Sequence, residues 1–389
     1  MSGAALRADA MGSLSHLRIV EMAAIGPAPF CGMLLADMGA EVLRIDRVTA
    51  TELGVAVPPR LDVLHRNKRA VALDLKRPAG VAAALALIAR ADVLIEGFRP
   101  GVMERLGLGP EACLEANARL VYGRMTGWGH AGPLAHAAGH DLNYIALAGA
   151  LHGIGAPDGP PAIPWNLVGD FGGGALYLAM GLLAAVIEAG RSGRGQVVEA
   201  AMVDGVASLM NMQQGIDQSG RWPQGRGAAL LNGGAPYYNV YRTLDGKYIS
   251  IAAIETRFYQ ELLRRLGQAP QPDAARAPDS WEALHERFSA IFATRTRTQW
   301  CELLEGTDAC FAPVLDLQES AAHPHMAARG TFVDVDGVRQ AAPAPRFSRT
   351  PSSLRRPPPD PGVAPDAALA DWGIDAQQLA AWRAGGVLD

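Results

Sequence analysis

Hydrophobic and polar positions follow a repeating plan along the first third of the chain. Residues 17–46 contain two β-rich runs, LRIVEM and EVLRID, separated by a stretch with the 3.6-residue apolar spacing of a helix. Strand-like runs recur at 91–98 and 119–127, and residues 78–90 again have helical spacing. Strands that alternate with helices predict an α/β fold with a parallel sheet.

The rest of the chain predicts a second, smaller domain. An apolar helix over 175–188 is followed by a strand, QVVEA, and another helix, and residues 213–236 are expected to form a long loop. A hairpin turning at Asp245-Gly246 and helices near 256–267, 279–294 and 297–305 indicate an α+β unit. We therefore expect a large Rossmann-like domain from 1–205 and 334–389, a linker over 206–236 and a small domain over 237–333. A Pro-rich strap and a helix from about 375 to 383 end the chain.

Composition narrows the class of protein. The 389 residues exceed the size at which one core usually divides, 49% of them are hydrophobic, and the formal net charge is −4. This balance argues against general nucleic-acid binding, although a local basic patch can hold an anionic ligand. We expect no signal peptide and no membrane span, because the longest apolar run, 175–187, is shorter than a bilayer requires. The four separated cysteines suggest reduced thiols in a cytoplasmic protein.

Several common sites are excluded by their missing motifs. The first strand-to-helix turn reads AIGPAP, so prolines stand where a G-x-G-x-x-G loop would offer N–H groups to a pyrophosphate. Neither C-x-x-C nor H-E-x-x-H nor G-x-S-x-G occurs. The sequence therefore predicts no standard dinucleotide site, no bound metal and no serine-hydrolase elbow.

His140 and Asp141 are adjacent, just before an apolar run with helical spacing. A histidine at a helix start is favoured in its neutral, basic form by the helix dipole, and the free N–H groups there could stabilise an oxyanion. The same pair would also suit a simple helix cap. The local pattern leaves both interpretations open.

Two further acidic residues share this ambiguity. Asp170 lies between IPWNLVG and FGGG, where apolar flanks would raise its pKa by desolvation, yet it too could cap a helix. Glu255 lies at a strand-to-helix corner of the smaller domain. Asp204 is a comparable acid inside an apolar helix.

Arginines follow the ends of several predicted strands. Arg47 follows the second strand, and Arg99 and Arg105 follow the strand at 91–98. Ligands of parallel sheets bind beyond the carboxyl ends of the strands, and arginine suits phosphate. This edge is therefore expected to bind a phosphate-bearing ligand.

With these segments assembled, the chain resembles the family III CoA-transferase superfamily, and within it the α-methylacyl-CoA racemases most closely. The resemblance covers nearly the whole chain. It rests on LRIVEMAAIGPAPFCGMLLADMGAEVLRIDR, NKRAVALDLK, ADVLIEGFRPGVMERLGLG, RMTGWGHAGP, AGHDLNYIALAGALHGIG, NLVGDFGGG, GRGQVVEAAMVDG, NGGAPYYNVYRTLDGKYISIAAIE and DACFAPVL.

The resemblance implies an interlocked homodimer that acts on acyl-CoA thioesters in fatty acid metabolism. It implies that His140 is a base, that Asp170 is its acid partner on the opposite face, and that Asp141 and Glu255 support them, with Glu255 from the other subunit. The positions that it implies for substrate and CoA binding are Ile25, Arg47, Leu73, Asp74, Leu75, Lys76, Gly97, Phe98, Arg99, Arg105, Gly139, Leu142, Asn143 and Tyr144.

The activity implied is racemisation at C2 of 2-methylacyl-CoA through an enolate, with no cofactor besides the CoA of the substrate. The first alternative is a CoA transferase of the same superfamily, in which the aspartate matching Asp170 forms an acyl intermediate. The second is a non-catalytic protein that binds a nucleotide or acyl-CoA. The segment 48–64 looks longer than the racemase pattern, which leaves the CoA contacts there open.

Overall fold

The computed structural model describes residues 12–49, 54–55, 57–220, 225–359 and 366–388. By its internal contacts the chain divides into two units. Unit 1 comprises residues 1–148, 165–209 and 325–389, and unit 2 comprises residues 149–164 and 210–324. The domain boundaries expected from the sequence refer to parts that fold independently. A division by contacts does not test independent folding, so these boundaries remain a prediction.

Unit 1 is built on the parallel sheet that the sequence predicts. Six parallel strands lie in the order β3-β2-β1-β4-β5-β6. Their bounds are β1 Arg18–Met22, β2 Glu41–Asp46, β3 Arg69–Ala72, β4 Val93–Glu96, β5 Val121–Thr126 and β6 Gln196–Ala201. The order reverses between β1 and β4, and such a reversal opens a crevice for ligands at the carboxyl ends of these two strands.

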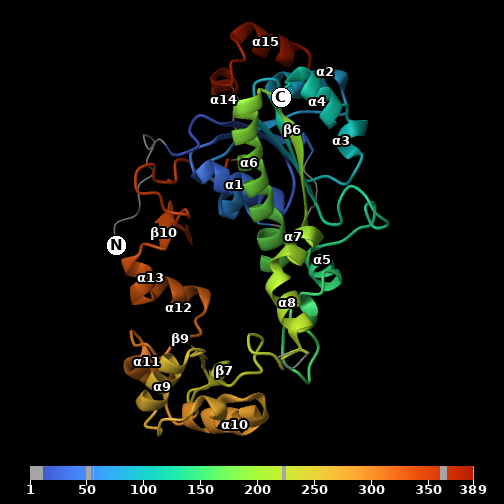
Figure 1. Ribbon diagram of the computed structural model, residues 1–389. Helices are drawn as coiled ribbons and strands as arrows, with labels where there is room; N and C mark the ends of the chain where they lie inside the picture. Colours follow the sequence, from blue (N-terminus) through green and yellow to red (C-terminus); the bar gives the residue numbers. More distant parts are fainter. Residues whose placement is uncertain (1–11, 50–53, 56, 221–224, 360–365, 389) are drawn as a thin grey trace. The chain divides into compact units, whose positions relative to one another are not determined.

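Helices lie on both faces of the sheet (Figure 1), and a hydrophobic core fills the space on each face. On one face Ile19, Val42 and Val93 pack against α1 (Pro27–Asp37) and α6 (Leu176–Ser192). On the other, Val20, Leu43 and further strand residues pack against α2 (Pro78–Ile88), α4 (Pro110–Ala116), α14 (Asp366–Asp371) and α15 (Ala376–Ala384). The C-terminal segment thus returns to the sheet.

The remaining elements of unit 1 are short and lie mostly beyond the strand ends. They are η1 (Pro59–Leu61), η2 (Val63–His65), α3 (Val102–Arg105), α5 (Asp141–Leu147), η4 (Leu167–Ala175), α7 (Met202–Leu209), β10 (Phe332–Val335) and β11 (Val338–Ala341). Helix α13 (Pro324–Ala328) begins at the last residue of unit 2. Neither β3 nor the β10–β11 hairpin was predicted.

Unit 2 has the predicted hairpin, β7 (Tyr238–Arg242) and β8 (Tyr248–Ala252), with β9 (Phe311–Pro313) added beside β8. Gly246 has φ +75° in the hairpin turn, a conformation that glycine adopts without strain. The helices of unit 2 are α8 (Asn211–Ser219), α9 (Thr256–Arg265), α10 (Trp281–Phe292), α11 (Arg297–Leu304) and α12 (Leu317–Ala322), with short helices η3 (Leu151–Gly153), η5 (Asp273–Arg276) and η6 (Pro278–Ser280). Residues of α9, α10 and α11 pack with β7 and β8 in one hydrophobic core. The prediction of a loop from residue 213 was wrong over α8.

The apolar helix is longer than its sequence pattern suggested. Helical structure is continuous from Leu167 to Ser192, which is long and apolar enough to cross a membrane by length and composition, and 39% of its most apolar window is buried. Leu178 and Leu182 pack on the sheet, whereas Met180 and Ile187 are exposed. The helix expected over 175–188 was therefore too short. A helix that packs on a sheet with one face can be as long and as apolar as a membrane-spanning helix, so length and composition do not distinguish the two.

A fully buried ion pair fixes α1 to the sheet. The Nζ of Lys68 lies 2.8 and 2.7 Å from the two carboxylate oxygens of Glu21 in β1, and it also donates to the carbonyl of Pro29 at 2.9 Å. A Cβ on Gly32 would lie 1.8 Å from Glu21, so only glycine lets α1 pass over this pair. The pair thus fixes the turn that leads from β1 into α1.

Lys68→Met should destabilise the fold by about 3–5 kcal/mol, because the Glu21 carboxylate would stay buried without its counter-charge. The free energy of unfolding in urea measures this loss. The double variant Glu21→Met with Lys68→Met should lose less than the single variant. Equal or greater loss in the double variant would contradict the assignment of the cost to the unpaired charge.

Candidate active site

The candidate site lies in unit 1 beyond the carboxyl ends of the strands. Gly26, the N-cap of α1 in the turn that follows β1, has φ +67°, and a Cβ there would lie 3.0 Å from Oδ2 of Asp170. A Cβ on Gly97, directly after β4, would lie 3.2 Å from the Cβ atoms of Ala24 and Ala28. The turns after β1 and β4 therefore meet at the reversal of strand order, and the Asp170 carboxyl group lies against the first of them.

His140 is the N-cap of α5, with extended backbone at φ −134° and ψ 173°. Its N–H donates to Oδ1 of Asn143 at 3.1 Å, while its carbonyl accepts from the N–H of Asn143 at 2.8 Å. The side chain of Asn143 thus supports the cap, and the His140 residue remains exposed. The cap and catalyst interpretations are therefore compatible at this residue.

Asp141 joins the start of α5 to the segment that carries Asp170. It is 6% exposed, and its Oδ1 accepts the backbone N–H of Asp170 at 2.7 Å. Its Oδ2 is buried without a hydrogen-bond partner among the described residues. A Cβ on Gly169 would lie 2.4 Å from Oδ1 of Asp141, so glycine is required for this approach.

Asp170 lies in a π-helix, η4, that continues directly into α6. The wider turn of a π-helix is rare and often occurs at functional sites. Gly205 of α7 packs on the backbone of η4, since a Cβ there would lie 1.8 Å from the carbonyl oxygen of Gly173. Phe171 stacks on Phe30 of α1 at 4.5 Å between ring centroids. Packing from two helices therefore holds the Asp170 segment.

The surroundings of Asp170 favour its protonated form. Burial raises its pKa, and the neighbouring Asp141 carboxylate raises it further. A hydrogen bond from Nδ2 of Asn166 to Oδ2 of Asp170, at 3.0 Å, lowers the pKa, as does His140. The expectation that desolvation raises this pKa is confirmed. His140 and Asp141 both lie within electrostatic reach of the Asp170 carboxyl group.

Tyr144 extends the site toward Arg99. Its hydroxyl donates to the carbonyl of Gly139, and its ring meets that of Trp128 edge-on at 4.7 Å. Burial raises the pKa of Tyr144 to about 12, Asp170 contributes to the rise, and Arg99 opposes it. Tyr144 therefore lies within electrostatic reach of both Asp170 and Arg99.

The remaining positions expected to contact CoA differ in exposure. Arg47, Lys76, Arg99, Arg105 and Leu142 are exposed, and Ile25 is 43% exposed. The guanidinium of Arg47 lies 5.8 Å from the ring centroid of Phe98. Leu73 is 1% exposed and belongs to the core, Leu75 packs against that core, and Asp74 accepts the N–H of Lys76 at 3.1 Å. The side chain of Leu73 is thus used for packing.

Glu255 belongs to unit 2, where it is the exposed N-cap of α9. Asn166 and Trp128 were not among the predicted site residues, although Asn166 stands four positions before Asp170. The i, i+4 spacing within a helical segment was the signal that could have identified Asn166.

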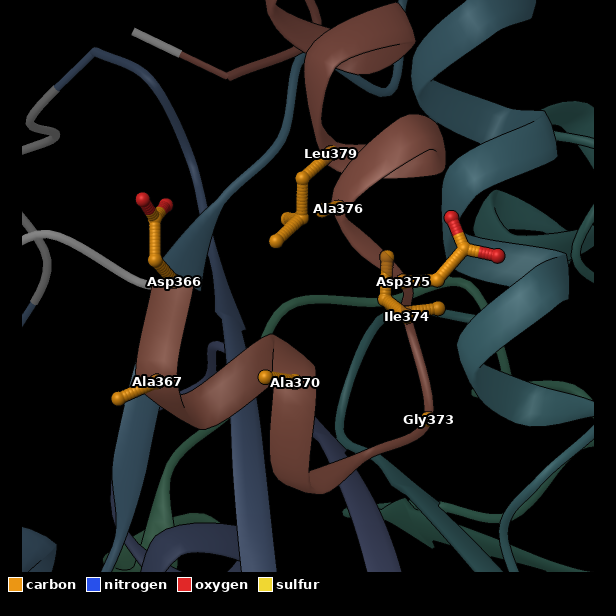
Figure 2. A pocket seen from close by; sticks show the side chains of 8 residues that line it. All are labelled: Asp366, Ala367, Ala370, Gly373, Ile374, Asp375, Ala376 and Leu379. Carbon is orange, nitrogen blue, oxygen red and sulfur yellow. The ribbon is translucent and has the colours of Figure 1, made fainter.

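An open hollow of about 520 Å³ lies elsewhere in unit 1, between α14 and α15 (Figure 2). Ile374 and Leu379 line it together with alanines, and Asp366 and Asp375 stand at its sides. None of the predicted site residues lines this hollow. Among the described residues no cluster of three or more His, Cys, Asp or Glu side chains could hold a metal ion.

The fold and this site place the chain in a known class of CoA-handling enzymes. It matches CoA-transferase family III over residues 14–364 and belongs to that family. The chain is 42% identical to alpha-methylacyl-CoA racemase of Mus musculus, over 94% of this chain and 95% of that protein. It is 41% identical to alpha-methylacyl-CoA racemase of Homo sapiens, over 89% of this chain and 90% of that protein. A crystal structure of a CAIB/BAIF family protein from Brucella suis aligns with a TM-score of 0.80 and 27% identity, covering 93% of this chain and 100% of that one.

Asn166→Ala should raise the pKa of Asp170 further, because the lost N–H donor stabilises only the ionised carboxylate. NMR titration of protein labelled with ¹³C at the aspartate carboxyl groups measures this change. The Asp170 signal is assigned by its loss in Asp170→Asn. An unchanged or lowered pKa in Asn166→Ala would contradict this electrostatic account.

Proposed function

We propose that this protein is an isomerase that interconverts the (2R) and (2S) forms of 2-methylacyl-CoA thioesters. The observation that carries the proposal is the hydrogen bond of Asp141 to the N–H of Asp170, which couples the cap residue His140 to a carboxyl group whose pKa is raised. The racemase names of the two mammalian relatives support the same reaction.

The reaction needs one proton-transfer group on each face of the α-carbon. The thioester carbonyl makes the α-proton acidic, so a base removes it and leaves a planar enolate. A proton delivered to the opposite face then inverts the centre. We assign these roles to His140 and Asp170, each of which serves as the base for one enantiomer and as the acid for the other. Because burial raises the pKa of Asp170, its acid form persists to higher pH than in water.

The enolate oxygen requires hydrogen-bond donors. The first N–H groups of α5, at Asp141 and Leu142, precede the first N–H that bonds back to His140. We assign these two groups to the enolate oxygen, since donors fixed before the reaction stabilise charge that develops during it. No metal or redox cofactor is needed for this proton transfer.

For the CoA moiety we propose the carboxyl edge of the sheet. Arg47, Arg99 and Arg105 are exposed there and suit its phosphates, and the Phe98 ring offers a flat apolar surface. Tyr144 and Gly139 would line the thioester end, next to Asp170. We keep the cytoplasm as the proposed location and fatty acid metabolism as the proposed context.

The homodimer is also part of the proposal. The exposed side of α6 carries Leu176, Met180 and Ile187, which are 51%, 61% and 66% exposed, and neighbouring Leu147 and Leu209 are exposed as well. Such a patch is unusual for a surface in water and typical of an interface. We propose that a second copy covers this face and supplies its Glu255 to support His140.

The central test is isotope exchange. When the enzyme is incubated in D2O with a single enantiomer of 2-methylacyl-CoA and no acceptor acid, the substrate should gain deuterium at C2 and lose optical purity. His140→Ala and Asp170→Ala should each reduce racemisation by about 10²–10⁴-fold, the usual contribution of a general acid or base. Asn117→Ala, a change away from the site, serves as the matched control. Transfer of CoA to an added carboxylate, without exchange at C2, would instead support the transferase alternative.

Met180→Glu with Ile187→Glu should convert a dimer into monomers, because two charges would be buried at the interface. Light scattering after size-exclusion chromatography measures the mass. Charge reversal at the exposed Glu111 of α4 is the control and should leave the mass unchanged. A wild-type protein that is monomeric at all concentrations would refute the dimer.

A further inference from the structure

Glu96 is a buried carboxyl group that the proposed mechanism does not use. It is the last residue of β4, is 2% exposed, and directly precedes Gly97, Phe98 and Arg99, here called the β4 loop. Its Oε2 accepts the backbone N–H of Phe98 at 2.8 Å. The Glu96 side chain therefore closes the turn from which the β4 loop begins.

Arg124 of β5 stands opposite Glu96 in the strand register. Its Nε is 3.7 Å from Oε1 of Glu96, and its Nη2 donates to Glu104 of α3. Its Nη1 lies 3.3 Å from Nδ1 of His130, in the loop after β5. Arg124 thus connects Glu96 to the segments that follow both β4 and β5, and its charge favours an ionised Glu96.

The groups around Glu96 shift its pKa in opposite directions. The pKa of Glu96 is raised to about 7, because the effects of burial and of Glu104, which raise it, outweigh those of the Phe98 N–H and of Arg124, which lower it. Tyr122, His130 and Glu104 are further titratable groups that face Glu96 or Arg124. Burial raises the pKa of Tyr122, burial and Arg124 lower that of His130, and backbone and Arg124 contacts lower that of Glu104.

We propose that Glu96 is a positioning residue for CoA: its ionised carboxylate orders the β4 loop through the N–H of Phe98, and its protonation weakens CoA binding without altering the chemical step. This inference rests on the proposed function in one respect, namely that the β4 loop contacts CoA. A charged acceptor forms a stronger hydrogen bond than a neutral one, so the ordered loop needs the ionised form.

The sign of the effect follows from the direction of titration. Above neutral pH Glu96 is ionised and the loop is ordered, and as the pH falls through about 7 the carboxylate takes up a proton. Affinity for CoA should therefore be higher at pH 8 than at pH 6. Phosphate monoesters also titrate near pH ~6, so the free ligand adds its own pH dependence. Comparison of two variants with the same ligand removes that contribution.

The experiment is calorimetric titration of the full-length protein with CoA, between pH 6 and pH 8, for wild type and Glu96→Gln. Glutamine keeps a carbonyl acceptor but neither charge nor titration. The wild-type affinity should rise about fivefold more than that of the variant from pH 6 to pH 8, since charge-assisted bonds are roughly twice as strong as neutral ones. At saturating substrate, kcat should be the same in both.

Two control variants distinguish a specific effect from a general loss of charge. Glu104→Gln removes a group that raises the pKa of Glu96, so the midpoint of the affinity change should move to lower pH. Glu115→Gln, an exposed carboxylate of α4, should leave the midpoint in place. A midpoint that does not move in Glu104→Gln would contradict the proposal.

Equal pH dependence in wild type and Glu96→Gln would overturn the role of Glu96, while CoA binding itself would still stand. Absence of CoA binding by the wild type would overturn the proposed function and this inference together. Should Glu96→Gln not fold, hydrogen exchange of the Phe98 amide in the wild type decides. After correction for the intrinsic pH dependence of exchange, its protection should be greater at pH 8 than at pH 6, and equal protection would refute the proposal.

Discussion

The hydrogen bond between the Asp170 N–H and the Asp141 carboxylate is the contact on which the site depends. It joins the first turn of α5 to the π-helical segment, two elements 29 residues apart in the sequence, at 2.7 Å. Gly169 permits the approach, and the close packing of Gly205 on Gly173 holds the segment from behind. Together with the packing of Gly169 against Ile145, this contact sets the position of the Asp170 segment relative to the start of α5, where His140 lies. Two side chains that transfer protons at opposite faces of one substrate α-carbon must be held at a fixed distance from each other.

The parallel sheet supplies the second constraint. Reversal of the strand order brings the turns after β1 and β4 together, so Gly26 meets the Asp170 carboxyl group while the β4 loop begins beside it. The Glu21–Lys68 pair fixes the first turn through Pro29, and Glu96 closes the second. Buried carboxylates at the carboxyl ends of β1 and β4 thus hold both turns.

Periodicity was enough to predict five of the strands of the parallel sheet, the covering helices α1, α2, α6 and α15, and the hairpin of unit 2. It did not predict the covering helices α4 and α14. It could not predict β3, because NKRAVALDLK is charged at both ends and gains its place only by pairing with β2. The π-helix could not be predicted either, because the spacing of its apolar residues resembles that of an α-helix. Its wider turn depends on tertiary packing. His140, Asp141 and Asp170 could be named from local sequence only as caps or catalysts. The hydrogen bond between Asp141 and Asp170 in the folded protein brings the three residues into one site.

The proposed racemisation requires that Asp170 exchange a proton and not attack the thioester carbonyl. The most direct measurement is mass spectrometry of the Asp170 peptide after incubation with 2-methylacyl-CoA and quenching with hydroxylamine, which converts a CoA thioester of aspartate, the second intermediate of a transferase, into a stable hydroxamate. We predict an unmodified Asp170 in a sample whose substrate has gained deuterium at C2 in D2O. A hydroxamate at Asp170, with no deuterium in the substrate, would contradict the account.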